Sequence, residues 1–191
     1  MIVRDLVSCL SRVTPAGPLD AEVSALTASS REVAPGSLFA AVRGTSVDGH
    51  RFIGDALAAG AVAILAESAP PEDLSPSVAW LHVPDSRAAL SAFASAFFDH
   101  PWKDLAMAGV TGTNGKTTTT FLIHHVMQTA WHRAGLLGTI LVDDGEREAP
   151  AKHTTPGSIE LSSLLGRMRD NGCRGVAMEG SSHGIHQKRV A

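Results

Sequence analysis

The sequence has few of the features that mark secreted, membrane-spanning or nucleic-acid-binding proteins. Its only cysteines, Cys9 and Cys173, are far apart and fit neither a disulfide framework nor a thiolate metal site. We therefore expect two buried thiols in a reducing, cytoplasmic compartment. Because 16 Lys and Arg residues face 19 Asp and Glu residues, the net charge of −3 leaves no basic stripe for a nucleic-acid backbone. No nucleic-acid partner is expected.

Long apolar runs are also missing. The first twenty residues contain Arg4, Asp5 and Arg12 and have the pattern of neither a signal peptide nor a membrane span, and no later window supplies a span. We therefore expect no membrane partner. What remains is a composition with 44% hydrophobic and 18% charged residues, typical of a soluble globular protein with one large or two small domains.

The first half of the chain alternates between predicted strands and helices. Short apolar runs predict strands at residues 38–42, 62–66 and 79–83. A helix is predicted between the first two strands, from Phe52, and another from Ser86, whose apolar residues share one face. Pro101 ends that helix and marks the predicted domain boundary. The alternation indicates an α/β fold.

The second half predicts a strand at 105–110, a Gly-rich turn and a helix with one apolar face. That face is formed by Ile123, Val126, Met127 and Ala130. Further on, the pattern predicts a strand over 136–142, a helix with Leu161, Leu164, Leu165 and Met168 in register, and a strand over 175–178. Parallel sheets usually have four or more strands. About three are predicted here, so we expect an incomplete sheet.

The motif "GVTGTNGKTTTT" at residues 109–120 carries the clearest chemistry. A strand, a Gly-rich turn and a helix direct successive backbone N–H groups and the positive end of the helix dipole to one point, which suits a polyphosphate. Gly112 and Gly115 permit the tight path, Lys116 supplies a charge for the terminal phosphates, and the Thr117 hydroxyl suits Mg²⁺. The generic Walker pattern would place another glycine five positions before Gly115, where this sequence has valine.

This spacing resembles the ATP loop of the Mur ligases, which keeps Gly-x-x-Gly-Thr-Asn-Gly-Lys-Thr. Three other stretches carry the same resemblance: residues 29–53, 153–158 and 178–191. The resemblance implies an α/β fold with a small N-terminal domain over 1–101 that binds the UDP substrate. It implies that 102–191 form the first part of an ATP-binding domain of the P-loop type with a parallel sheet, which this chain leaves incomplete.

The resemblance also implies an activity, namely ATP-dependent amide ligation in peptidoglycan synthesis. The reaction adds the third amino acid, diaminopimelate or lysine, to UDP-N-acetylmuramoyl-L-alanyl-D-glutamate through an acyl phosphate. ATP and Mg²⁺ are the implied cofactors, and the UDP-muramoyl dipeptide and an amino acid are the implied binding partners. Because family members continue with the rest of the central domain and a third domain, a truncated chain ending at Ala191 is not expected to turn over alone.

The resemblance assigns roles residue by residue. The ATP loop maps onto Gly112, Thr113, Asn114, Gly115, Lys116, Thr117 and Thr118. The uridine end of the substrate maps onto Ala28, Ser30, Thr45, Ser46 and Val47. The muramoyl peptide maps onto His153, Thr154, Thr155, Ser181, Gln187 and Arg189.

Two residues carry the implied catalytic roles, Lys116 and Glu179. Glu179 matches the carboxylate that coordinates Mg²⁺ together with the hydroxyl of Thr117. The family has Val where this chain has Gly180. Because glycine lacks a side chain to pack and costs backbone entropy in a strand, we expect Glu179 to be held loosely.

Three other readings remain open. Another Mur ligase or a folylpolyglutamate-type ligase would share the loop, but not the arrangement at residues 29–53. A non-catalytic module that binds a nucleotide or a UDP-sugar would require no further domains. A kinase or a simple NTPase is disfavoured by the loop spacing.

Overall fold

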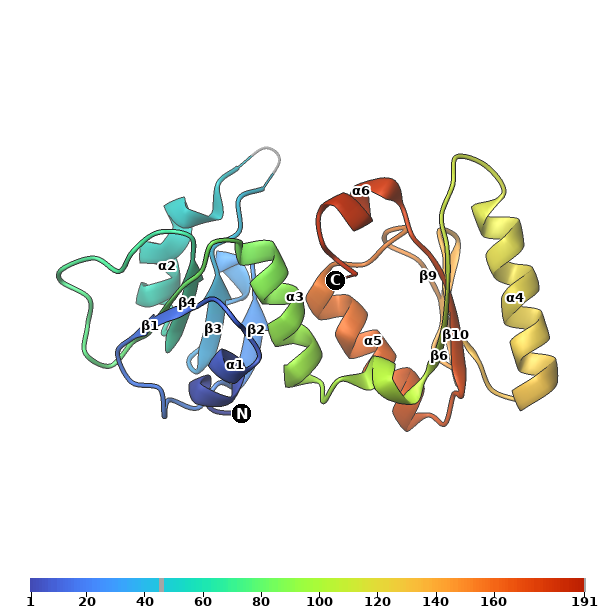
Figure 1. Cartoon of the computed structure of the whole chain (residues 1–191), viewed down its shortest axis with the longest axis horizontal. Coiled ribbons are helices and arrows are strands. Elements are labelled where there is room, and N and C mark those ends of the chain that lie inside the picture. Colours follow the sequence, from blue (N-terminus) through green and yellow to red (C-terminus); the bar gives the residue numbers. More distant parts are fainter. Residues whose placement is uncertain (45–46, 191) are drawn as a thin grey trace. The chain divides into compact units, whose positions relative to one another are not determined.

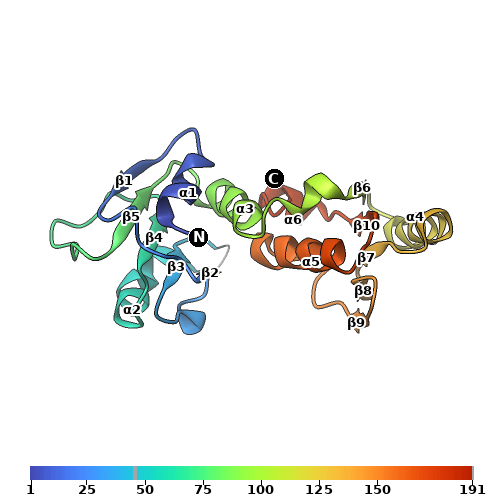
Figure 2. The ribbon, with the colours of Figure 1, turned by 90° about the horizontal axis from the view of Figure 1, so that it is seen from below.

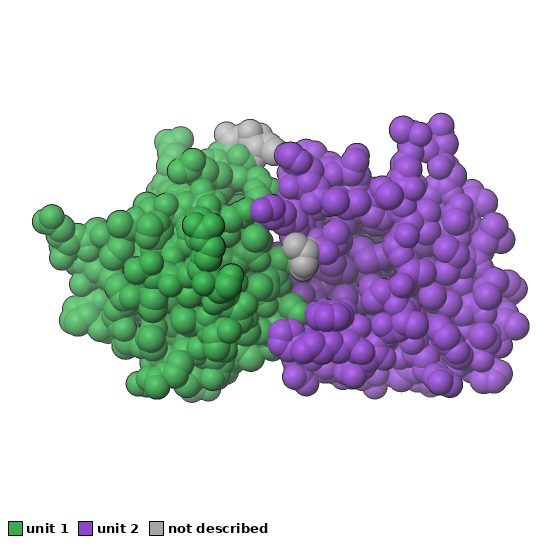
Figure 3. Space-filling model, viewed as in Figure 1, with its two compact units in different colours: residues 1–97 green, residues 98–191 purple. Residues whose placement is uncertain are grey.

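The computed structural model describes residues 1–44 and 47–190, and these form two compact units. The first unit comprises residues 1–97 and the second residues 98–191 (Figure 3). Each unit has its own five-stranded sheet. Within the described residues, no helix has the length and apolar character that crossing a bilayer requires.

The first unit is a mostly parallel sheet with the strand order β1-β5-β4-β3-β2. Its strands are β1 (Thr14–Ala16), β2 (Ala25–Thr27), β3 (Ser37–Ala40), β4 (Ala63–Ala66) and β5 (Ala79–His82). Its helices are α1 (Val3–Ser8), α2 (Ile53–Ala58) and α3 (Ser86–Phe97), with short 3₁₀ helices at Ser30–Glu32 and Gly49–Phe52. Only β1 runs antiparallel to its neighbour.

Alternating side chains of these strands build two cores. Phe39, Ile64 and Trp80 pack with α2 on one face of the sheet. Figure 1 shows α3 on the other side, where its Phe93 is fully buried. The predicted strands are confirmed as β3, β4 and β5, and α3 begins at Ser86 as expected. The strands β1 and β2 were not predicted, because three residues are too few to show a period.

The second unit has the strand order β6-β10-β7-β8-β9. Its strands are β6 (Ala106–Val110), β7 (Gly135–Leu137), β8 (Leu141–Asp143), β9 (Glu148–Pro150) and β10 (Gly175–Glu179). Its helices are α4 (Lys116–Trp131), α5 (Ser158–Asp170) and α6 (Ser182–His186), with a 3₁₀ helix at Pro101–Asp104. The helices α4 and α5 cover opposite faces of the sheet (Figures 1 and 2). Leu164 and Met168 of α5 pack there against Val176 and Met178 of β10.

The α/β architecture agrees with the prediction, but two details of the second unit differ. The single strand expected over 136–142 is wrong, because a turn in which the Gly138 N–H donates to the Leu141 carbonyl (3.1 Å) splits it into β7 and β8. The strand β8 pairs antiparallel with β7 and with β9. The sheet therefore has five strands, where the sequence predicted about three.

The apolar face expected for α4 is also wrong. Val126 is 65% exposed and Ala130 is exposed, whereas Thr120 is fully buried. Apolar residues lie on more than one side of this helix, and the sheet contacts one side only. Periodicity therefore detected the helix but did not identify the side that packs.

Candidate functional site

The Gly-rich loop joins the end of β6 to the start of α4 (Figure 1). Gly112 (φ 148°) and Gly115 (φ 77°) adopt backbone conformations that favour glycine, and Gly115 is the N-cap of α4. The Lys116 ammonium group donates to the carbonyls of Gly112 (2.8 Å) and Thr113 (3.4 Å). Lys116 is also the first residue of α4, so its charge and the N-terminal N–H groups of this helix belong to the same end of the helix.

Glu179 ends β10, directly beside the end of β6, where it pairs in register with Val110. Its side chain is fully buried and accepts three hydrogen bonds. One carboxylate oxygen accepts from the Thr139 N–H (2.9 Å), and the other accepts from the hydroxyls of Thr139 (3.0 Å) and Thr117 (3.1 Å). The expectation that Glu179 is held loosely is therefore wrong. Gly180 follows the strand and donates its N–H to the Val110 carbonyl (2.8 Å).

These elements enclose a pocket of about 420 Å³. It is lined by Thr113, Asn114, Gly115, Lys116, Thr117, Thr118, Thr139, Thr154, Glu179 and Ser181. Only Thr139 was not predicted from the sequence. It lies in the turn after β7, at the carboxyl edge of the parallel strands, where open α/β sheets bind ligands. A prediction that ended β7 at Leu137 would have placed Thr139 at this edge and identified it as a site residue.

The oxygen atoms at Glu179 suit a magnesium ion brought by a nucleotide. All three hydrogen bonds that Glu179 accepts come from uncharged donors, so they leave its negative charge uncompensated. Carboxylate and hydroxyl oxygens are hard ligands of the kind that Mg²⁺ prefers, and this ion keeps several waters and phosphate oxygens. No group of three His, Cys, Asp or Glu side chains able to hold a metal occurs in the described part of the chain. The residues present therefore fit a nucleotide-bound ion, not an all-protein cage.

Four of the residues assigned to the muramoyl peptide form one hydrogen-bonded cluster. The Arg189 guanidinium donates to the Thr155 carbonyl (2.8 Å) and twice to the Gln187 side-chain oxygen (2.9 and 2.7 Å). The Thr155 hydroxyl donates to the Glu179 carbonyl (3.1 Å) and accepts from the Ser181 N–H (2.9 Å). The cluster thus connects directly to the backbone of Glu179.

The remaining predicted residues lie elsewhere. Thr154 lines the pocket with its hydroxyl oxygen 3.2 Å from that of Thr139, whereas His153 is exposed and does not line it. Ala28, Ser30 and Val47 belong to the first unit, where Ala28 and Val47 are exposed and Ser30 is half-buried. The other two predicted substrate residues, Thr45 and Ser46, lie outside the described residues.

The two cysteines are unlike each other, so the expectation of two buried thiols is half wrong. Cys173 is buried just before β10, and burial raises the pKa of its thiol to about 11, with the Asp143 and Asp144 carboxylates adding to the effect. Cys9 is exposed because it caps the end of α1, a short helix that buries Val3 and Leu6 instead.

A glycine loop between strand and helix, with a buried carboxylate on the neighbouring parallel strand, defines an α/β protein of the phosphate-loop class. Two family models match the chain. The model described as Mur ligase middle domain matches residues 110–191, and the model described as Mur ligase family, catalytic domain, matches residues 22–98. The chain belongs to the Mur ligase family.

Curated relatives agree with this assignment. The chain is 40% identical over 190 residues to a UDP-N-acetylmuramoyl-L-alanyl-D-glutamate–2,6-diaminopimelate ligase of Geobacter metallireducens, which covers all of this chain and 37% of the relative. It is 47% identical over 169 residues to the protein of the same name from Geobacillus thermodenitrificans, covering 88% of this chain and 34% of that protein. The chain thus spans little more than a third of the length of these relatives.

Solved structures show the same fold. A structure of a UDP-N-acetylmuramoyl-L-alanyl-D-glutamate–2,6-diaminopimelate ligase matches with a TM-score of 0.76 at 24% identity, over all of this chain and 38% of that one. A MurF ligase from Thermotoga maritima in complex with ADP matches with a TM-score of 0.51 at 24% identity, over 85% of this chain and 32% of that one.

Proposed function

We propose that the chain carries the ATP loop and the uridine-end segments of an ATP-dependent ligase of peptidoglycan precursor synthesis. The reaction would add diaminopimelate or lysine to UDP-N-acetylmuramoyl-L-alanyl-D-glutamate. Relatives about 40% identical over the whole chain bear the name of the diaminopimelate ligase, which supports this substrate class. Because the chain spans only 37% of the length of the first of these relatives, the reaction of the whole protein stays a proposal.

One observation carries the proposal, the hydrogen bond of 3.1 Å between the Thr117 hydroxyl and the buried Glu179 carboxylate. It joins the phosphate loop to the carboxylate beside the Lys116 ammonium group, in one pocket. Lys116 and the loop N–H groups would hold the terminal phosphates of ATP. Thr117 and Glu179 would hold the Mg²⁺ that accompanies them, and this ion would neutralise phosphate charge.

The chemistry consists of two transfers. A glutamyl carboxylate oxygen of the UDP substrate attacks the terminal phosphorus of ATP, which forms an acyl phosphate and releases ADP. The amine of the incoming amino acid then attacks the acyl carbon, which forms the amide, releases inorganic phosphate and gives up a proton. The protein's part in the first transfer is to position both anions and to reduce their repulsion, which is the role proposed for Lys116.

The substrate would be held at its two ends by different residues. Ala28, Ser30 and Val47 of the first unit would contact the uridine end, through loop N–H groups and a hydroxyl. The muramoyl peptide would contact Thr154 and the Arg189 cluster, where the planar guanidinium is fixed by three hydrogen bonds.

Titration calorimetry on the purified chain tests the proposal. We expect separate binding of Mg·ATP and of UDP-N-acetylmuramoyl-L-alanyl-D-glutamate, with Mg·ATP binding lost in Lys116→Ala and kept in Lys152→Ala, a change at an exposed lysine of the same unit. Binding of only one ligand would favour a non-catalytic nucleotide or UDP-sugar module. Binding of neither ligand would contradict the proposal.

A further inference from the structure

The first unit holds a second polar cluster at the carboxyl ends of β3 and β4. A narrow antiparallel ribbon, formed by residues 42–44 and 47–49, leaves β3 there. The Gly49 N–H donates to the Val42 carbonyl (2.9 Å), the Gly44 N–H donates to the Val47 carbonyl (2.9 Å), and Arg43 pairs with Asp48 in an antiparallel bridge. A Cβ atom on Gly44 would lie 2.5 Å from the Val47 carbonyl oxygen, so the ribbon requires glycine at this place.

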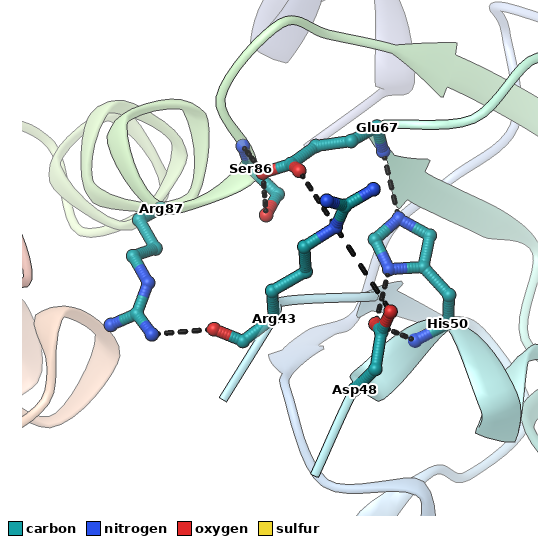
Figure 4. Close-up of polar contacts among 6 residues, drawn as sticks. All are labelled: Arg43, Asp48, His50, Glu67, Ser86 and Arg87. Carbon is teal, nitrogen blue, oxygen red and sulfur yellow. Dashed lines mark hydrogen bonds and ion pairs between the residues drawn. The ribbon is translucent and has the colours of Figure 1, made fainter. Parts of the chain in front are cut away.

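Five side chains anchor the base of this ribbon to β4 and α3 (Figure 4). Glu67, just after β4, accepts two hydrogen bonds from Ser86 at the start of α3, from its N–H (3.0 Å) and from its hydroxyl (2.9 Å). The other Glu67 oxygen pairs with the Arg43 guanidinium at 3.2 Å. The Glu67 N–H donates to Nε2 of His50 (3.0 Å), whose Nδ1 lies 2.7 Å from Asp48. The Arg43 guanidinium also lies 4.0 Å from the Asp48 carboxylate, so the contacts form a closed circuit (Figure 4).

The circuit assigns one protonation state to His50. Because Nε2 accepts from a backbone N–H, the ring proton sits on Nδ1 and is donated to Asp48. Hydrogen bonds from the His50 N–H and ring also lower the pKa of Asp48. If Nε2 also carried a proton, it would be a hydrogen-bond donor pointing at the Glu67 N–H, which is a donor as well, and this hydrogen bond would be lost. The charged groups around the ring are Asp48 and Glu67, with Arg43 and Arg87 beyond them (Figure 4).

The place of the circuit points to substrate positioning. Open α/β sheets bind ligands at the carboxyl edge of their parallel strands, and the ribbon projects from that edge. The ribbon carries Val47, one of the residues proposed to contact the uridine end, and Val47 is 48% exposed. Arg43 is 67% exposed, so its ion pair with Glu67 adds little to stability by itself. The circuit does, however, fix the direction in which the ribbon leaves the sheet.

We propose that Arg43, Asp48, His50 and Glu67 are positioning residues that hold residues 42–44 and 47–49 of the ribbon in the geometry that receives the uridine end of the substrate. The inference rests on the proposed function, because it presupposes that the first unit binds this ligand. It adds that binding requires the hydrogen bond from the Glu67 N–H to the His50 ring and the ion pair between Glu67 and Arg43.

The experiment measures the dissociation constant of UDP-N-acetylmuramoyl-L-alanyl-D-glutamate by calorimetry, and the thermal midpoint. Glu67→Gln keeps an oxygen for Ser86 but loses the charge that pairs with Arg43, so we expect about fivefold weaker binding at an unchanged midpoint. Arg4→Gln is the matched control, because it breaks another exposed ion pair of the same unit, Arg4 to Asp20 at 2.7 Å. It should leave binding unchanged.

A pair of His50 variants separates positioning from a merely structural role. His50→Gln keeps an acceptor for the Glu67 N–H, so it should bind the UDP substrate as the unaltered chain does. His50→Leu removes this acceptor and should weaken binding about fivefold. Should Glu67→Gln fail to fold, this comparison decides alone.

Two results would count against the inference, and they differ. If the unaltered chain binds the UDP substrate while Glu67→Gln and His50→Leu bind it equally well, the positioning role is wrong and the proposed function stands. If the unaltered chain does not bind the UDP substrate, the proposed function itself is wrong for the first unit.

Discussion

The replacement Glu179→Gln should separate folding from ligand binding, because the two depend on different properties of the same side chain. The glutamine is nearly isosteric, so no cavity forms around this fully buried position. Its oxygen can still accept from the Thr139 N–H, and the hydroxyls of Thr117 and Thr139 can rotate to accept from its NH₂ group.

The effect on stability is the difference of two similar quantities. Hydrogen bonds to a charged group contribute about 1.5–3 kcal/mol each and neutral ones about 0.5–1.5 kcal/mol, so three weakened bonds cost about 3 kcal/mol in all. Removing a buried charge relieves a desolvation penalty of roughly several kcal/mol. We therefore expect the free energy of unfolding to stay within about 1 kcal/mol of its original value, or to rise.

For nucleotide binding, no gain offsets the loss of the Glu179 charge. Two unit charges about 4 Å apart attract by about 4 kcal/mol at an effective dielectric constant of about 20, and a divalent ion attracts more strongly. Glu179→Gln should therefore weaken Mg·ATP binding by at least about 100-fold, while weak binding of ATP in EDTA is unchanged.

Calorimetry with and without Mg²⁺, together with urea unfolding, measures both quantities. Glu160→Gln, at an exposed carboxylate in the first turn of α5, is the matched control and should change neither. The reasoning is refuted if Glu179→Gln binds Mg·ATP as tightly as the unaltered chain, or if it loses several kcal/mol of stability.

Two further predictions concern stability and reactivity. Gly180→Ala should raise the free energy of unfolding by about 0.4–1 kcal/mol, because its φ is not positive and the new Cβ would lie 3.5 Å from its nearest neighbour. Gly184→Ala should lower it by at least about 1 kcal/mol, because its Cβ would lie 2.8 Å from Thr155, and urea unfolding that reversed this order would contradict the account. Iodoacetamide at about pH 8 should modify Cys9 and spare Cys173 until the chain unfolds, as peptide mass spectrometry would show. Because the pKa of the Cys173 thiol is raised in the folded chain from 9.0 to about 11, its contribution to stability is complete below pH 9.0 and is lost as the pH rises through about 11.

Local sequence patterns predicted the phosphate loop because its parts follow one another along the chain, whereas the role of Glu179, 62 positions beyond Thr117, was implied by the family resemblance. The loop from Gly112 to Thr117 lies between a predicted strand and a predicted helix, and Glu179 ends a clear apolar run. The place of Thr139 in the site was not predicted from the sequence, because it depends on a turn that splits one apolar run into β7 and β8. Such a split is decided by pairing with β9, which lies further along the chain.

The packing of helices was predicted less well than their existence. Leu164 and Met168 of α5 face the sheet as expected, and they share their side of the helix with Leu161 and Leu165. In α4, Val126 of the predicted apolar face is 65% exposed, and Leu122, another apolar residue of this helix, is 63% exposed. Which apolar side of such a helix packs depends on the elements around it, and periodicity does not contain that information.

The central claim is that residues 112–118 surround the phosphates of ATP, with Thr117 and Glu179 at the metal and Thr139 hydrogen-bonded to Glu179. Backbone amide NMR of the ¹⁵N-labelled chain, titrated with Mg²⁺ and a non-hydrolysable ATP analogue, tests it most directly. The account predicts that the amide signals of these residues move together and saturate at one affinity. It is contradicted if those signals stay in place, whether the analogue shifts a different set of amides or none.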